Sequence, residues 1–331
     1  MNGGVILIEN AAEILEKYPI KVFRTYRGRG ALCCETENGI KLLKEFESSK
    51  SRAENINYVL KLLIENGYPN VDSIIENCEN CLFSYDSEER VYILKNWFEG
   101  SECDTKSLED VIKTVIELAK LHNYLNIISD KVRDIIPHND YYKECKKRNC
   151  ELKHVKNFIY KKRKKTDFEL CFLRNYNYFM EQAINSTEYL GRESNNNIPI
   201  SICHGNFNHH NVIIGVNRIA VTNFDKMCYD VQILDLYDFL RKIMEKYNWN
   251  INVGLLLVDT YRKYRNLTKA ELINLYRRLN YPEKFWKISN QYYNSNKAWV
   301  SEKIVSKMKK IEEQEYQRSA YLKAFREWIE F

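Results

Sequence analysis

The sequence contains no run of about 18 or more apolar residues, the length at which a membrane-spanning helix becomes a candidate. The N-terminal stretch MNGGVILIENAAEI also lacks the basic start and the small-residue cleavage site of a signal peptide. No internal repeat and no low-complexity stretch is present. We therefore expect a cytoplasmic protein with no membrane insertion.

A strong charge of one sign is missing as well. The 51 lysines and arginines exceed the 45 aspartates and glutamates by only 6, so the composition does not indicate a nucleic-acid-binding protein. A weakly anionic partner or a phosphate ligand agrees with it equally well. The five consecutive cations of KKRKK, at positions 161–165, lie in a predicted helical region. A solvated face is the commoner explanation for them, and an anionic partner is the alternative.

The ten cysteines form no disulfide framework, because they are scattered along a long chain. We expect buried, reduced thiols. The one CxxC pair, Cys78 and Cys81, falls in a predicted turn and has no second pair at zinc-finger spacing. Adjacent His209 and His210 are expected to point apart, with no cysteine or carboxylate spaced to complete a metal site.

With 331 residues and 44% hydrophobic content, the chain can form sizeable cores. Residues 20–46 predict three strands, residues 52–66 a helix, and residues 81–86 and 90–98 two further strands. After residue 97 the pattern becomes mainly helical, apart from a strand hairpin that turns at residues 216–218. The predicted helices are 106–124, 139–163, 167–188, 235–247, 252–264, 269–279 and 301–329. The aromatic group Tyr281, Phe285, Trp286, Tyr292, Tyr293 and Trp299 predicts core packing or contact with another protein.

Three residues between these elements have the spacing of a kinase catalytic loop. His204, Asn206 and Asn211 match the pattern H-x-D-x-x-x-x-N, except that asparagine replaces the aspartate. In this pattern the third residue meets the hydroxyl that attacks the γ-phosphoryl group, and the later asparagine holds magnesium. An asparagine at position 206 accepts a hydrogen bond from a hydroxyl but cannot take its proton.

The next strand, Val221 to Asp225, lies where a magnesium-binding carboxylate is expected. The pattern places the principal ligand at Asn223 and a second at Asp225, and a hairpin one residue different would exchange them. An Asp225 that points toward Asn211 would favour an active enzyme, and an outward one a binding module. Asp235 is predicted to cap the following helix and to brace the loop.

The first part of the chain supplies candidates for binding phosphates. Lys44 on the third strand is the candidate phosphate-binding lysine, Lys41 is the alternative on the same strand, and Glu54 on the next helix can pair with the lysine. A surface pair of little energetic value is the other interpretation. Gly28 and Gly30 predict either a turn that covers phosphates or an ordinary hairpin.

Taken together, these features resemble the aminoglycoside phosphotransferase and choline kinase superfamily. The resemblance rests on Lys44, Glu54, the hinge-like Leu94 to Trp97 with Asn96, LAKLH, the loop HGNFNHHN, TNFD and DLYDFLRK. Within it, LNYPEKFWKISNQYYNSNKAWVS looks like the CotS family of spore coat proteins.

The resemblance implies an α+β, bilobal, protein-kinase-like fold. Its small mixed α/β lobe would be residues 1–97, and its larger, mainly helical lobe residues 98–331. It further implies a protein made in the mother cell and deposited in the spore coat, with other coat proteins as partners and with ATP and magnesium as candidate cofactors. Asparagine at 206 and 223 favours a degenerate phosphotransferase used for nucleotide binding or coat assembly. The alternative is an active kinase that phosphorylates a hydroxyl on a small molecule or a coat protein.

Overall fold

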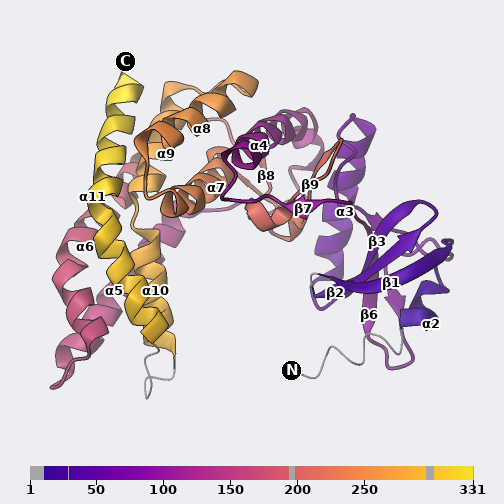
Figure 1. The fold of residues 1–331 in the computed structure, drawn as a ribbon, viewed down its shortest axis with the longest axis horizontal. Helices are drawn as coiled ribbons and strands as arrows, with labels where there is room; N and C mark the ends of the chain where they lie inside the picture. The colour runs from indigo at the N-terminus through magenta and orange to yellow at the C-terminus, as the bar shows by residue number, and fades with distance from the viewer. Residues whose placement is uncertain (1–10, 29, 194–197, 296–301, 331) are drawn as a thin grey trace. The chain divides into compact units, whose positions relative to one another are not determined.

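The computed structural model describes residues 11–28, 30–193, 198–295 and 302–330 (Figure 1). The chain divides into two compact units. The first comprises residues 1–137 and 202–228, and the second comprises residues 138–201 and 229–331. The strands β8 (Ser201–Cys203) and β11 (Cys228–Asp230) lie where the chain passes from one unit to the other.

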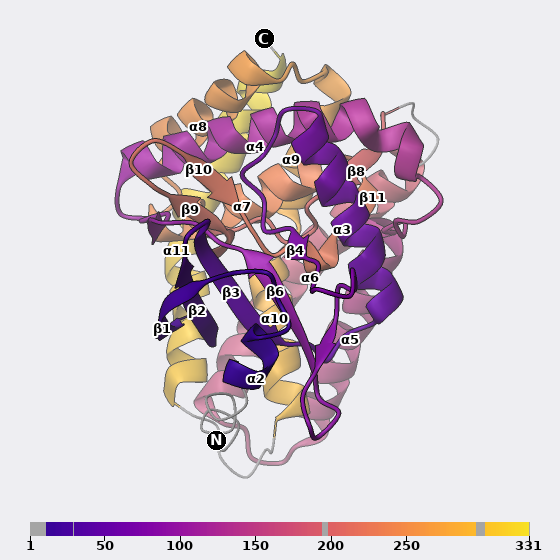
Figure 2. The same ribbon diagram turned by 90° about the vertical axis from the view of Figure 1, so that its right-hand side faces the viewer.

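An antiparallel sheet dominates the first unit, and Figure 2 shows its strands side by side. The strand order is β1-β2-β3-β6-β4, and β5 pairs with β6. The strands are β1 (Val22–Gly28), β2 (Ala31–Thr36), β3 (Gly39–Glu45), β4 (Ile74–Ile75), β5 (Ser84–Tyr85) and β6 (Val91–Asn96). The predicted meander over residues 20–46 and the strands around residues 84 and 93 are therefore confirmed.

The two faces of this sheet have separate cores, because successive side chains of a strand point to opposite faces. Leu43 and Leu94 pack against the short helix α2 (Ala11–Leu15) on one face. Leu42 on the other face packs with Trp97 and Phe98. The helix α3 (Lys50–Glu65) begins at its N-cap Ser49, whose hydroxyl accepts a hydrogen bond from the backbone N–H of Arg52.

The rest of the first unit carries the predicted hairpin. A three-stranded sheet has the order β10-β9-β7, and its strands are β7 (Ser101–Glu102), β9 (Val212–Ile214) and β10 (Ile219–Val221). The helical elements are α4 (Leu108–Ile128) and the short 3-10 helices η1 (Ser129–Val132), η2 (His209–Asn211) and η3 (Phe224–Lys226). The hairpin is confirmed, but its second strand ends at Val221 instead of continuing to residue 224.

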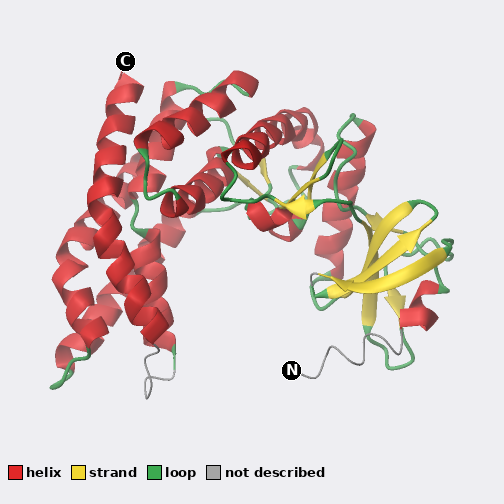
Figure 3. Ribbon diagram, in the orientation of Figure 1, coloured by secondary structure: helices red, strands yellow, loops and turns green. Residues whose placement is uncertain are grey.

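The second unit is built from helices, drawn red in Figure 3. They are α5 (Tyr141–Lys161), α6 (Asp167–Glu193), α7 (Ile233–Lys246), α8 (Ile251–Tyr264), α9 (Lys269–Asn280), α10 (Glu283–Asn294) and α11 (Glu302–Glu330). A core of apolar side chains joins α5, α6, α10 and α11, and Phe285 and Tyr292 lie in it, with Trp286 and Tyr293 packed against it. The prediction of core packing for these aromatic residues is confirmed, whereas Trp299 lies outside the described residues.

Several elements differ from the sequence predictions. The helix α10 was not predicted, although its buried residues Phe285, Ile288 and Tyr292 recur at helical spacing. The helix α7 begins at Ile233, with Gln232 at its N-cap position, so the buried Asp235 lies in its first turn and not at its cap. The helix α5 ends at Lys161, so only the first cation of KKRKK is helical. All ten cysteines are free, but Cys78, Cys81 and Cys150 are exposed rather than buried.

No helix in the described ranges has the length and apolar character needed to cross a membrane. The lobe boundary near residue 97 remains a prediction.

Candidate functional site

The loop between β8 and β9 carries the kinase-like spacing and lies in the first unit. His204 is fully buried, and its Nε2 atom lies 3.0 Å from the carbonyl oxygen of Thr222. Its ring packs against Phe207 and Phe224. His204 therefore ties the loop to the segment that follows β10, which is a positioning role.

Gly205 adopts a backbone conformation with φ of +76°. A Cβ atom at this position would lie 1.9 Å from the carbonyl oxygen of Lys226. The main chain of η3 therefore approaches the loop so closely that a side chain would force the two segments apart.

Replacing Gly205 with alanine is expected to lower the free energy of unfolding by about 2–4 kcal/mol, from the left-handed backbone and the steric overlap together. Gly30 is the matched control, because its φ is +71° and no atom lies within 4 Å of a Cβ placed there. Gly30→Ala should lose only about 1–2 kcal/mol, the backbone term alone. Chemical denaturation measures both losses, and equal losses would show that the contact with Lys226 carries no weight.

Hydrogen bonds join Asn206 and Asn211 of the loop to Asn223, which follows β10. The side-chain amide of Asn223 donates to Oδ1 of Asn211 at 2.8 Å, and the amide of Asn211 donates to the backbone oxygen of Asn206 at 3.0 Å. Asn223 has a φ of 65°, a left-handed conformation that asparagine tolerates better than most residues. The structure thus brings together the two predicted metal-ligand positions, 211 and 223, through an amide-to-amide contact.

A buried ion pair lies beside Asn223. The Asp72 carboxylate accepts hydrogen bonds from the backbone N–H of Asn223 at 3.0 Å and from Nζ of Lys95 at 2.9 Å. Lys95 also lies 4.0 Å from the carboxylate of Asp225. Burial disfavours the charged form of Lys95, but the Asp72 and Asp225 carboxylates outweigh it and hold the pKa of Lys95 above its usual value.

Sequence reasoning did not single out Asp72 or Lys95 as charged site residues. The signal for Lys95 was present, since it is the single charged residue among the buried positions of β6. A buried lysine in a strand requires a carboxylate partner. No local pattern identifies that partner as Asp72, because the pair spans 23 residues.

A cavity of about 480 Å³ opens on the face of the antiparallel sheet that carries Lys44 and Lys95, next to the start of α3. Its charged lining consists of three cations and three carboxylates: Lys44, Arg52, Lys95, Glu45, Glu47 and Asp225. The lining is therefore balanced in formal charge before any ligand or metal is added.

The register of the sheet distinguishes the two candidate lysines. Lys44 pairs with Ile93 and shares the cavity face with Lys95, whereas Lys41 pairs with Asn96 on the opposite face. The Lys41 ammonium is hydrogen-bonded to Oδ1 of Asn96 at 2.9 Å, and burial lowers its pKa. Lys44 is exposed at the cavity, so it is the lysine on β3 that a ligand there would meet.

The other predicted nucleotide contacts are placed differently. Glu54 is exposed and does not line the cavity. Gly30 lines the cavity, whereas Gly28 is the last residue of β1 and is not part of the lining. Arg52, Ala53 and Ile56 of α3 line the cavity, and Arg52 is the charged one among them. Its Nε donates to the backbone oxygen of Asp225 at 2.9 Å, and its Nη2 donates to that of Met227 at 3.0 Å.

The residues present fit a magnesium site poorly. Magnesium prefers charged oxygen ligands, yet Oδ1 of Asn211 already accepts a hydrogen bond and Asn223 is uncharged. Asp225 lines the cavity with its side chain 62% exposed, and its charged neighbour is Lys95. Within the described ranges, no group of three or more His, Cys, Asp or Glu residues could hold a metal ion.

The two adjacent histidines correct one detail of the sequence interpretation. Their rings lie 3.9 Å apart instead of pointing in different directions, and Nδ1 of His210 contacts the Glu102 carboxylate. The short helix η2 brings the rings together, because helical backbone does not alternate side chains as a strand does.

Solved structures share this architecture and show the class of protein to which the fold belongs. An aminoglycoside phosphotransferase from Alicyclobacillus acidocaldarius matches with a TM-score of 0.83 at 17% identity, over 96% of each chain. A spectinomycin phosphotransferase, APH(9)-Ia, solved with ADP and spectinomycin, matches with a TM-score of 0.63 at 13% identity, over 91% of this chain and 92% of that one. The choline kinase LicA from Streptococcus pneumoniae matches with a TM-score of 0.53 at 11% identity, over 96% and 100%. The α+β, protein-kinase-like fold predicted from the sequence is confirmed.

The model of the spore coat putative kinase YutH family matches residues 11–325, so the chain belongs to that family. No curated protein matches it in sequence. The predicted membership of a spore coat protein family is therefore confirmed, and the chain is a kinase-like spore coat protein whose fold is that of the aminoglycoside phosphotransferases.

Proposed function

We propose that this protein is a degenerate phosphotransferase that serves the spore coat as a nucleotide-binding or assembly module. The observation that carries the proposal is the hydrogen bond between the amides of Asn223 and Asn211. Two carboxylate or carbonyl oxygens at this distance repel each other unless a cation lies between them. An amide N–H that faces the oxygen removes both the repulsion and the need for a cation.

The charges around the cavity support the same proposal. Lys95 lies between Asp72 and Asp225 and compensates carboxylates that would otherwise attract a divalent metal. Asn206 offers no carboxylate to take a proton from a hydroxyl. Lys44 is the exposed cation left for a phosphate group. The structural neighbours include complexes with ADP, AMP and AMP-PNP, so a nucleotide is the first ligand to test.

The second candidate function is an active kinase acting on a hydroxyl of a small molecule or a coat protein. One observation favours it, namely that Asp225 lines the same cavity as Lys44 and Lys95. An Asp225 released from Lys95 would supply a carboxylate for magnesium. In either case we place the protein in the mother cell and then in the spore coat, with other coat proteins as partners.

Thermal-shift titration with ATP tests the proposal. We expect ATP to raise the melting temperature equally with magnesium and with EDTA, because the site has no ligand set for a divalent metal. ADP with EDTA is the control for a contribution from the γ-phosphate. A shift that requires magnesium would support the active kinase. No shift under any condition would contradict nucleotide binding, and coat assembly would then be the one role of the proposal that is left.

A further inference from the structure

One face of the helix α5 in the second unit carries only basic charge. Its exposed positions recur every three or four residues and therefore lie on one side of the helix. They are Tyr142, Lys143, Lys146, Lys147, Cys150, Lys153, His154, Asn157, Tyr160 and Lys161, and the exposed Glu144 flanks them. We call the five lysines and the histidine of this set the basic face. The opposite side of the helix is buried in the core of the unit.

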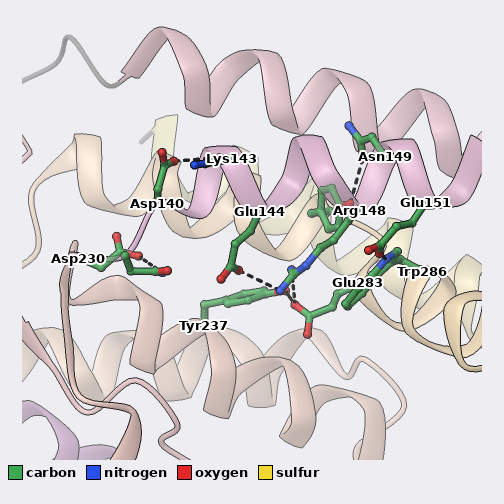
Figure 4. Close-up of polar contacts among 12 residues, drawn as sticks. Asp140, Lys143, Glu144, Arg148, Asn149, Glu151, Asp230, Tyr237, Glu283 and Trp286 are labelled. Atoms are coloured by element: carbon green, nitrogen blue, oxygen red, sulfur yellow. Dashed lines mark hydrogen bonds and ion pairs between the residues drawn. The ribbon is translucent and has the colours of Figure 1, made fainter. Parts of the chain in front are cut away.

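The acidic residues of α5 do not neutralise the basic face. Glu144 is paired with Arg148 at 3.1 Å, and Glu151 accepts a hydrogen bond from Nε1 of Trp286 at 2.6 Å. Figure 4 shows both carboxylates directed toward these partners. None of the five lysines forms an ion pair with a carboxylate in the described part of the chain.

The basic face is unfavourable for the isolated helix. Lys143, Lys146 and Lys147 crowd the first two turns, where the helix dipole disfavours positive charge, and Lys143 and Lys147 are a repulsive pair four residues apart. The buried apolar side maintains the helix in spite of this repulsion. Carboxylates from outside the unit would relieve it.

We propose that the basic face is a docking surface for an acidic, Asp- and Glu-rich segment of another protein. Lys143 and Lys161 are eighteen residues apart, so the face extends about 27 Å along the helix, enough for an extended peptide. Beyond the helix, the exposed Arg163 and Lys164 continue it, whereas Lys162 is engaged by the buried Glu169 at 2.6 Å.

The composition of the face favours carboxylates over phosphate polymers and over lipid. All its permanent cations are lysines, which act as point charges, whereas the planar fork of arginine suits phosphate groups. Tyr142 and Tyr160 are the large apolar side chains on this side of the helix, one near each end, so it lacks the continuous apolar half that an interfacial membrane helix inserts. A flexible acidic segment needs neither feature.

Binding of fluorescently labelled poly-L-glutamate, followed by anisotropy at several salt concentrations, tests the proposal with the full-length protein. The variant Lys146→Gln/Lys147→Gln/Lys153→Gln should bind roughly tenfold more weakly and with a smaller salt dependence, because three ion pairs are lost. The control is Lys303→Gln/Lys307→Gln/Lys310→Gln on α11. It removes three exposed lysines from a helix whose exposed surface also carries Glu302 and Glu313, and it should bind like the wild type.

Equal weakening by the control variant would overturn the assignment to α5. Tighter binding of single-stranded DNA or of phosphatidylserine vesicles than of poly-L-glutamate at the same salt would overturn the proposed class of partner. No binding of poly-L-glutamate at low salt would overturn the docking surface itself. These outcomes are independent of ATP binding, so they leave the proposed function untouched.

Discussion

The double variant Asn206→Asp/Asn223→Asp is expected to hydrolyse ATP at least roughly 100-fold faster than the wild type, the usual contribution of a catalytic base. A carboxylate at position 223 would face the carbonyl oxygen of Asn211, and that pair of oxygens favours a divalent cation between them. A carboxylate at position 206 would supply the base. Release of phosphate from Mg-ATP is the measurement, since water can replace an unknown acceptor.

The single variants are the controls for this prediction. Each should remain close to the wild type, because a base has nothing to act on without an aligned phosphate, and an aligned phosphate lacks a proton acceptor without the base. A double variant that binds Mg-ATP but does not hydrolyse it would place the defect elsewhere. Wild-type turnover equal to that of the double variant would identify Asp225 as the working metal ligand.

Glu283→Ala is expected to lower the free energy of unfolding of the helical unit by about 3–5 kcal/mol, the cost of leaving a buried charge without its partner. Figure 4 shows Glu283 beside Arg148 and Tyr237. The hydroxyl of Tyr237 donates to it at 2.6 Å, and Arg148 and Arg241 lie within 3.5 Å and 3.4 Å. The alanine variant would leave the buried Arg241 and the partly buried Arg148 without their shared carboxylate, with Glu245 and Glu144 as their remaining partners. Chemical denaturation followed by circular dichroism measures the loss.

Glu330→Ala is the matched control, because Glu330 pairs with Arg326 on the exposed surface of α11. Its loss should stay below about 1 kcal/mol. A loss at Glu283 no larger than this would contradict the role of the buried network.

Acid should reduce the contribution of Glu283 to the free energy of unfolding. Burial alone would raise its pKa, but Arg241 and Arg148 outweigh burial and hold the pKa below the usual value of 4.5. A carboxylate whose pKa is lowered on folding contributes stability above the unfolded pKa and loses it as the pH falls through the folded pKa. The difference in stability between the wild type and Glu283→Gln should therefore shrink as the pH falls below about 4.5.

The strand meander and most of the long helices were predictable from the sequence, whereas the helix α10 and some of the shortest strands were not. The meander and the helix α6 follow alternation and 3.6-residue spacing. The helix α10 was not predicted, although Phe285, Ile288 and Tyr292 recur at helical spacing along it. The two-residue strands β4 and β7 are too short to show an alternating pattern. They are strands because they pair with β6 and β9, which are distant in the sequence. The strand predicted to reach residue 224 stops at Val221, and Asn223 has a left-handed backbone conformation. Its backbone N–H donates to Asp72, which is 151 residues away, so no local pattern indicates this contact.

The candidate site was predictable in its loop and less so in its charges. The spacing of His204, Asn206 and Asn211 identified the loop, since those residues are close in sequence. Which strand lysine faces the cavity depends on sheet register, and the sequence left Lys41 and Lys44 open. Arg52 contacts main-chain oxygens. Because every residue has a main-chain oxygen, the sequence cannot indicate which residues accept these hydrogen bonds.

The contact of Arg52 with two backbone oxygens bears on how this part of the first unit moves. The guanidinium group joins the first turn of α3 to η3, so an outward swing of α3 would leave the carbonyls of Asp225 and Met227 without their donor. The two segments should therefore open together in a single cooperative event, and the amide hydrogens at the start of α3 and in η3 should exchange with solvent at similar rates. A ligand that enters the cavity would then find its walls already in place and would spend little of its binding free energy on ordering them.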